Sequence, residues 1–292
     1  MFNKIILLNI VFSFFFSCND KSNSFIETKN GYSLNFHEIS GDTNKVSKGC
    51  IVNLNIIARD ENQRIVFSSK FNGLDGVSSF YYDSIIVKSP MNDILLNTFK
   101  GDSLSFIMIS SVFYNSLFGE KLLNRIPVDS SSLMVNLKVL GYLTYNEQID
   151  YQKKLEIAAQ INEDSILQYS RKVWDSKFLN IYKTRGVYAI KLSSNDSLNF
   201  YGDSLENEII IGYSMNELSG RLIYKTNYLN PEIYDRSKEG QLLEGFQLLV
   251  SKFQKGDSIV ALLPSNLLFG KKGSFINQIP PYTPMKINLK IN

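Results

Sequence analysis

The sequence holds few of the residues on which most enzyme chemistry depends. Its 292 residues include two cysteines, one tryptophan and a single histidine, His37. A His-based triad or metal site would therefore have one candidate, and the scattered carboxylates form no pair typical of a glycosidase. We expect no metal and no cofactor. The net charge of +3 comes without a dense Lys/Arg cluster, which argues against a nucleic-acid partner.

Hydrophobic side chains are, in contrast, abundant. They make up 44% of the chain and aromatic residues 13%, which is enough to build packed cores and is unlike a disordered composition. A length of 292 residues suggests about two domains. We therefore expect a folded protein with two cores.

The N-terminal end of the chain has the pattern of a targeting segment. Lys4 precedes an apolar run over 5–16 that is too short to favour a membrane span. The run leads into Ser and then Cys18, which resembles the lipobox of bacterial lipoproteins, although Phe15 stands where Leu is usual. The resemblance implies a signal peptide over 1–17 and acylation of Cys18. An ordinary secretory signal is the alternative.

The segment over 18–30 is polar and predicts a flexible tether after the acylated cysteine. The other cysteine, Cys50, opens an apolar alternating run, where a cysteine is most often a small buried hydrophobe. We therefore expect no disulfide.

A pattern in the first half of the chain recurs about 155 residues later, which indicates a repeated domain. The matching segments are Lys-Gly-Asp-Ser at 100–103 and 255–258, Leu-Phe-Gly at 117–119 and 268–270, Ile-Pro at 126–127 and 279–280, and the closing runs at 134–139 and 285–291. The repeat predicts two domains, over 31–144 and 184–292.

Alternating apolar residues predict three strands before each of these motifs. The expected strands span 32–39, 50–59 and 64–69 in the first copy, and 187–192, 208–216 and 221–226 in the second. One helix per copy is expected, because the apolar residues at 242–253 follow a 3.6-residue period and 90–99 is a shorter counterpart. This order predicts an α+β domain, a twisted antiparallel sheet wrapped on one helix.

Between the copies, residues 145–183 are rich in Glu, Lys and Gln with apolar residues interspersed, which predicts a helical linker. The segment at 162–165 is either a break or a new N-cap. The apolar residues indicate that the linker packs on one or both domains. Trp174 is expected to anchor it there.

The order of elements at the C-terminal end resembles an FKBP-type peptidyl-prolyl isomerase domain. The resemblance rests on Gly-Gln-Leu-Leu-Glu-Gly-Phe at 240–246, Lys-Gly-Asp at 255–257, Leu-Pro-Ser at 263–265, Leu-Phe-Gly at 268–270 and Ile-Pro-Pro at 279–281. With the weaker upstream copy, the chain is similar to a tandem of two FKBP-like domains of the α+β class.

The reaction of that family needs no nucleophile, metal or cofactor. Rotation about a peptide bond has a barrier of about 18–20 kcal/mol, and a catalyst must bind the twisted amide better than the planar one. A dry aromatic pocket favours the twisted amide, while a backbone N–H and a few polar groups orient the peptide.

The resemblance implies an apolar pocket in the second copy with altered polar groups. The candidate catalytic residues are Tyr213 at the aromatic wall, Phe246 in place of the floor Trp, and Phe269 in place of a Tyr that donates to the ligand. The candidate binding residues are Ile223, Tyr224, Leu242, Leu243, Ile279 and Ile287. Tyr224 stands at an Asp position of the family, and the second N–H of the Leu pair is the one that holds the ligand carbonyl.

The first copy departs further from the pattern. Ile56 stands near the Tyr position, Phe67 at the Asp position, Met91 at the floor and Phe118 at the hydroxyl position. These changes favour a role in docking or in holding a substrate over catalysis.

The implied function is that of an FKBP-type isomerase or chaperone-like lipoprotein at the outer membrane, facing the periplasm or the cell surface. It resembles isomerase lipoproteins of Bacteroidota, some of which are linked to gliding motility and protein secretion. The implied partners are proline-containing exported polypeptides, the membrane through the lipid, and a membrane-protein complex. The alternative is a catalytically silent binding or structural subunit of such a complex, and the sequence leaves activity open.

Replacing Cys18 by Ala is expected to abolish acylation and move the protein out of the membrane fraction. The reason is that each buried CH₂ of an acyl chain contributes about 0.8 kcal/mol to membrane binding. Radioactive palmitate labelling and detergent phase partition measure both effects. Cys50→Ala is the control and keeps the label, whereas a labelled Cys18→Ala protein would contradict the lipobox assignment.

Overall fold

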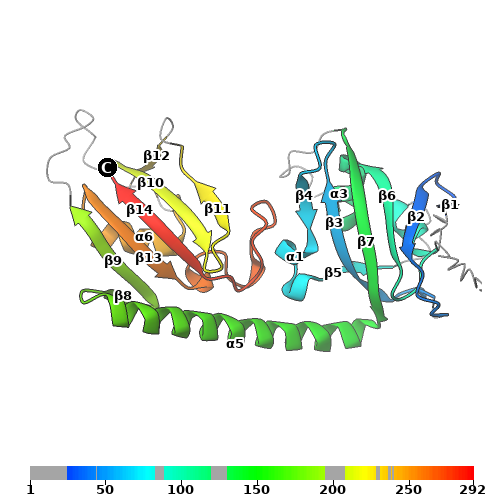
Figure 1. Cartoon of the computed structure of the whole chain (residues 1–292), viewed down its shortest axis with the longest axis horizontal. Coiled ribbons are helices and arrows are strands. Elements are labelled where there is room, and N and C mark those ends of the chain that lie inside the picture. Colours follow the sequence, from blue (N-terminus) through cyan, green and yellow to red (C-terminus); the bar gives the residue numbers. More distant parts are fainter. Residues whose placement is uncertain are drawn as a thin grey trace, which may run out of the picture.

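The computed structural model describes residues 25–43, 45–82, 89–119, 130–194, 208–227, 231–235, 238 and 240–292. Two antiparallel seven-stranded sheets lie at the two ends of an elongated molecule, and one long helix, α5, runs beneath both (Figure 1). The expected signal peptide and Cys18 lie outside the described residues. Within them, no helix is long and apolar enough to cross a membrane.

The first sheet has the strand order β1-β2-β6-β7-β3-β4, with β5 also pairing with β3. Its strands are β1 (Phe25–Glu27), β2 (Ser33–Glu38), β3 (Ile51–Arg59), β4 (Ile65–Ser68), β5 (Ser78–Tyr81), β6 (Ser103–Ile109) and β7 (Ser132–Leu143). The three strands predicted upstream of the first motif are confirmed as β2, β3 and β4. β1 lies within the segment expected to be a tether, and pairs with β2.

The second sheet has the strand order β11-β10-β14-β13-β9-β8, with β12 also pairing with β10. Its strands are β8 (Tyr182–Thr184), β9 (Val187–Ser194), β10 (Glu208–Glu217), β11 (Leu222–Lys225), β12 (Glu232–Asp235), β13 (Asp257–Leu263) and β14 (Met285–Ile291). Read from β8, this order repeats the first sheet strand for strand. The topology therefore shows the repeat that the sequence predicted.

Each sheet buries one face, because its side chains alternate along the strand. On β14, Met285, Ile287, Leu289 and Ile291 are buried, while the residues between them are exposed. β7 alternates in the same way from Leu133 to Val139. Burial of one such aliphatic side chain contributes about 1.5–3 kcal/mol, so these central strands hold each core together.

The turn before β6 and the turn before β13 are built alike. Gly101 and Gly256 have φ of 94° and 91°, values that favour glycine. The aspartate that follows each glycine closes the turn: Asp102 Oδ2 accepts the Phe99 N–H at 2.8 Å, and Asp257 Oδ2 accepts the Gln254 N–H at 3.0 Å. The repeated Lys-Gly-Asp motif is thus a turn motif.

The expectation of one helix per domain holds only in part. The apolar faces of α2 (Pro90–Leu95) and α6 (Glu244–Lys252) pack in the two cores, as expected. The first domain also contains α1 (Ser69–Asn72), η1 (Leu74–Gly76) and α3 (Ser110–Phe118). In the described part of the second domain, the helical elements besides α6 are the short turns η2 (Ser265–Leu267) and η3 (Gly270–Lys272) after β13. α3 forms because Phe113 and Tyr114 point into the first core, 0% and 6% exposed.

The linker helix α5 (Tyr145–Lys177) is continuous through the predicted break at 162–165. Thr144 and Glu147 form a reciprocal capping box at its start. The helix prediction over 145–183 runs too far at its C-terminal end, because residues 182–184 pair with β9 as strand β8. Trp174 is half-buried and its ring packs edge-on against Phe178, 5.7 Å away.

Polar side chains attach α5 to both domains. Gln148 donates to Ser79 Oγ of the first domain at 2.8 Å. Glu163, only 8% exposed, accepts hydrogen bonds from the Ser265 N–H at 2.6 Å and the Ser265 hydroxyl at 2.7 Å. Arg171 donates to the Gly186 carbonyl at 2.7 Å. The linker is therefore fixed at several points along its length.

Two further residues singled out by the sequence have structural roles. Cys50 is a free thiol buried in the first core, as predicted. His37 is exposed on β2, and its Nε2 lies 3.0 Å from Ser105 Oγ. A catalytic role for the histidine is not supported by this position.

We expect Glu163→Ala to lower the free energy of unfolding of the second domain by about 1.5–3 kcal/mol, because the buried Ser265 donors lose a charged acceptor. Differential scanning calorimetry measures this as a lower melting temperature. Asp164→Ala is the matched control on the exposed side of the same turn of α5. Equal melting temperatures for the two variants would contradict the role of Glu163.

Candidate functional site

The aromatic residues predicted for the second domain meet at the junction of β10, β11 and α6. The Tyr213 ring packs edge-on against Phe246 at 4.6 Å between centroids, and is tilted against Tyr224 at 5.2 Å. Phe246 is 3% exposed, Tyr213 is half-buried and Tyr224 is 39% exposed. The cluster thus runs in a row from the core to the surface, with Phe246 as its floor.

A carboxylate that the sequence did not indicate completes this cluster. Glu232 on β12 lies at the edge of the cluster, and Tyr224 donates to its Oε1 at 2.7 Å. Burial raises the pKa of the Tyr213 phenol, and the charge and hydrogen bond of Glu232 raise it further. β12 was not among the predicted strands, so nothing in the sequence placed Glu232 beside Tyr213.

The start of α6 supplies a backbone group to the same region. Leu242 and Leu243 are half-buried against the second core, directly before the first residue of the helix. The Leu243 carbonyl accepts from the Phe246 and Gln247 N–H groups at 2.9 and 3.1 Å. Among the described residues, no acceptor is assigned to the Leu243 N–H.

The other predicted site residues differ in how far they are buried. Phe269 and Ile223 are half-buried against the second core. Ile279 and Ile287 are 1% and 0% exposed, and Ile287 pairs with Met215 and Ala261 on the neighbouring strands. These two isoleucines have a packing role, and their contact with a ligand stays a prediction.

The corresponding positions of the first domain differ from those of the second. Ile56 and Met91 are fully buried in the core. Phe67 and Phe118 form an aromatic cluster that includes Phe275, which belongs to the second domain, with Phe275 and Phe118 centroids 4.4 Å apart. The sequence did not single out Phe275.

Surface cavities border the second domain. One of about 340 Å³ lies beside Gly212, Ser214 and Asn288 of its sheet, and Tyr213 is among its lining residues. A larger one, of about 810 Å³, lies between the domains and is lined by α5, α1 and residues 280–284.

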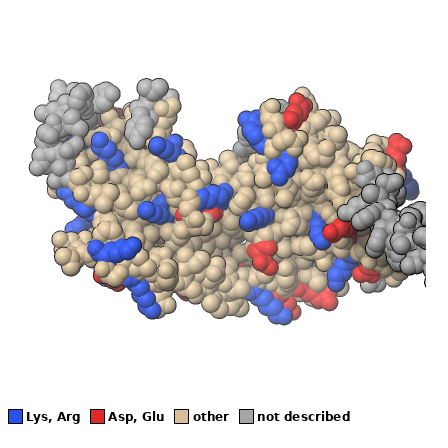
Figure 2. Space-filling view, in the orientation of Figure 1, with Lys and Arg blue, Asp and Glu red and all other residues tan. Residues whose placement is uncertain are grey.

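Charged residues give little indication of a site. Lys and Arg are spread over the face seen in Figure 2, with Asp and Glu among them. In the part of the chain that the structure describes, no three His, Cys, Asp or Glu residues are grouped so that they could hold a metal ion. The candidate site is therefore aromatic and apolar, with one carboxylate.

No family model and no curated protein matches this chain. Its structural neighbours among solved proteins are FKBP-type peptidyl-prolyl isomerases. A peptidyl-prolyl cis-trans isomerase from Pseudomonas syringae is 13% identical, with 46% of this chain and 91% of that chain covered and a TM-score of 0.36. The three FKBP domains of wheat FKBP73 are 13% identical, with 92% of this chain and 97% of that chain covered and a TM-score of 0.32.

FkpA from Escherichia coli is 16% identical, with 50% of this chain and 66% of that chain covered and a TM-score of 0.38. All three TM-scores are below 0.5.

Replacing Glu232 by Gln is expected to lower the pKa of Tyr213 while leaving it above 10. The negative carboxylate disfavours the phenolate, and burial alone still disfavours it. Because the folded-state pKa is raised, this tyrosine contributes stability below pH 10 that is lost as the pH rises further. NMR titration of ¹³C-labelled tyrosine measures the shift.

Tyr142 is the internal control for that titration, because burial in the first domain raises its pKa to about 12. The pKa of Tyr142 is expected to be the same in the wild-type protein and in Glu232→Gln. An unchanged pKa for Tyr213 would show that the Glu232 carboxylate does not face its ring in solution.

Proposed function

We propose that the chain is an FKBP-type peptidyl-prolyl isomerase or chaperone-like lipoprotein, with weak activity in its second domain. The observation that carries this proposal is the cluster of Tyr213 and Tyr224 over Phe246, with Glu232 hydrogen-bonded at its edge. The resemblance implies an Asp where this sequence has Tyr224. We infer that Glu232, on the next strand along the chain, β12, supplies the carboxylate instead.

In this proposal the residues act by position and not by covalent chemistry. The Tyr213 ring, which covers Phe246, rotates away, and a prolyl ring takes its place on Phe246 beside Tyr224. The Leu243 N–H then donates to the peptide carbonyl. Removal of water from around the twisted amide lowers its free energy relative to the planar, more polar amide. Glu232 holds the Tyr224 hydroxyl in place, so the wall of the pocket is ordered before the peptide binds.

The proposed partners are exported polypeptides that contain proline. Acylation at Cys18 would hold the protein at the outer membrane, facing the periplasm or the cell surface, and would place it where such chains emerge. A complex with membrane proteins of the secretion or gliding type belongs to the same proposal. The support for this part is the N-terminal sequence pattern.

A second candidate is a catalytically silent binding subunit. It is favoured by the burial of Phe246, which is 3% exposed beneath the Tyr213 ring. A proline ring reaches that floor only if Tyr213 or Tyr224 rotates away. If both rings stay in place, the domain binds partners without catalysis.

A protease-coupled isomerisation assay on Xaa-Pro peptides separates the two candidates. The full chain is expected to accelerate isomerisation, and Phe246→Leu is expected to reduce kcat/KM at least tenfold because the floor loses its aromatic ring. Leu is close to Phe in size, so the core stays filled. Circular dichroism checks that the variant is folded.

Phe106→Leu is the matched control, since Phe106 is 2% exposed in the first core and far from the site. It is expected to keep full activity. A folded wild-type protein that binds Xaa-Pro peptides without accelerating their isomerisation would establish the silent alternative instead.

A further inference from the structure

A hairpin of the second domain reaches into the first. The segment between η3 and β14 leaves the second sheet and extends toward β4 and α1 (Figure 1). Ser274 and Ile279 exchange two backbone hydrogen bonds, of 2.9 and 2.8 Å, and close a turn with Phe275 next to its base. Gln278, with φ of 50°, donates from its N–H to the Phe275 carbonyl at 3.1 Å. The turn is therefore held by its own hydrogen bonds.

The Phe275 side chain is half-buried and packs against the core of the first domain. Its ring centroid lies 4.4 Å from Phe118, 5.7 Å from Phe67 and 6.0 Å from Tyr114. Such separations are those of interacting aromatic pairs. Ile279, four residues on, packs in the core of its own domain.

The receptor for this ring is built by the first domain alone. Phe67 packs edge-on against Phe113 at 5.5 Å and against Phe118 at 5.9 Å. Phe67 and Phe113 are 1% and 0% exposed, so their positions are fixed by the core, whereas Phe118 is half-buried at its edge. Without Phe275, this edge would present aromatic surface to solvent.

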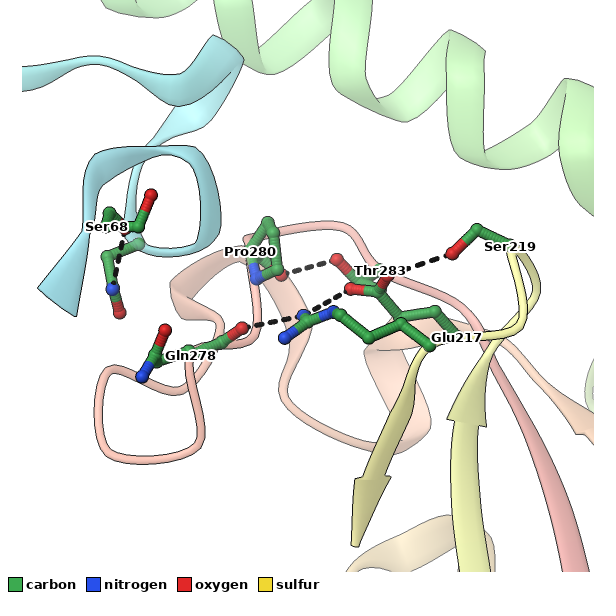
Figure 3. Close-up of polar contacts among 8 residues, drawn as sticks. Ser68, Glu217, Ser219, Gln278, Pro280 and Thr283 are labelled. Carbon is green, nitrogen blue, oxygen red and sulfur yellow. Dashed lines mark hydrogen bonds and ion pairs between the residues drawn. The ribbon is translucent and has the colours of Figure 1, made fainter. Parts of the chain in front are cut away.

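Polar contacts beside the ring hold the hairpin in place. The Arg221 guanidinium lies 4.1 Å from the centre of the Phe71 ring, and Arg221 also donates to the Gln278 carbonyl at 2.7 Å and to Glu217 at 2.5 Å. Gln278 faces the segment that contains Ser68 (Figure 3), and its amide donates to the Val66 carbonyl at 3.5 Å. One arginine thus joins the hairpin, its own domain and α1.

We propose that the edge formed by Phe67, Tyr114 and Phe118 is a binding site for a phenylalanine carried on a tight turn of polypeptide, and that Phe275 of the same chain occupies it. The ligand class is defined by the occupant, an aromatic ring on a hydrogen-bonded hairpin. In this state the first domain is closed to other chains, and it becomes available when the hairpin withdraws. The proposal does not depend on isomerase activity in the second domain.

The test uses the detergent-purified full chain and a fluorescent cyclic peptide with the sequence of residues 271–281. The proteins are wild type, Phe275→Ala, Phe275→Ala with Phe118→Asp, and Ile276→Ala. Ile276 is the matched control in the same turn, because it is 62% exposed. Fluorescence anisotropy measures binding, and hydrogen exchange reports protection of β4 and α3.

We expect the peptide to bind Phe275→Ala at least tenfold more tightly than wild type, Ile276→Ala or the double variant. We also expect faster exchange in β4 and α3 of both variants that lack Phe275, and unchanged exchange in Ile276→Ala. Equal peptide binding to wild type and Phe275→Ala would overturn the proposal, and so would the absence of peptide binding to Phe275→Ala. Unchanged exchange in Phe275→Ala would overturn the occupancy by Phe275.

Discussion

The rigid attachment of α5 to both domains is the constraint on which the arrangement of this protein depends. A helix of 33 residues is about 50 Å long, and it keeps its length because its backbone hydrogen bonds are internal. Gln148 near its start bonds the first domain, and Glu163 and Arg171 bond the second. These bonds hold both sheets on one helix, so that the hairpin carrying Phe275 lies against the edge of the first sheet.

One strand order thus carries two different aromatic clusters in the same chain. Both domains have the same strand order and the same turn aspartate before the sixth strand of the repeat. In the second domain, α6 presents Phe246 to two tyrosines and a carboxylate. In the first, the equivalent region is an aromatic edge that receives a ring from its neighbour. The difference lies in the side chains after β6 and β13, where α3 replaces two short turns.

The sequence allowed much of the fold to be predicted, because the signals that specify it are local. Alternation predicted β2, β3, β4, β9, β10 and β11 to within about two residues at nearly every end, and β14 from its motif. Four short strands were missed: β1 in the expected tether, β8 in the expected linker helix, and β5 and β12. β5 and β12 are four residues long and follow irregular segments. Their pairing depends on β3 and β10, which are distant in sequence, so no local pattern marks them.

The chain by itself determined the repeat, the inward face of each central strand, the turn glycines and the aromatic residues from which a site can be made. These depend on periodicity and backbone geometry, which adjacent residues carry. Only the tertiary structure decided that Glu232 lies beside Tyr213 and Tyr224, that Ile279 lies inside the core, and that Phe275 packs against the other domain. Those outcomes depend on which distant segments share a surface, and close packing selects among the arrangements that the local pattern leaves open.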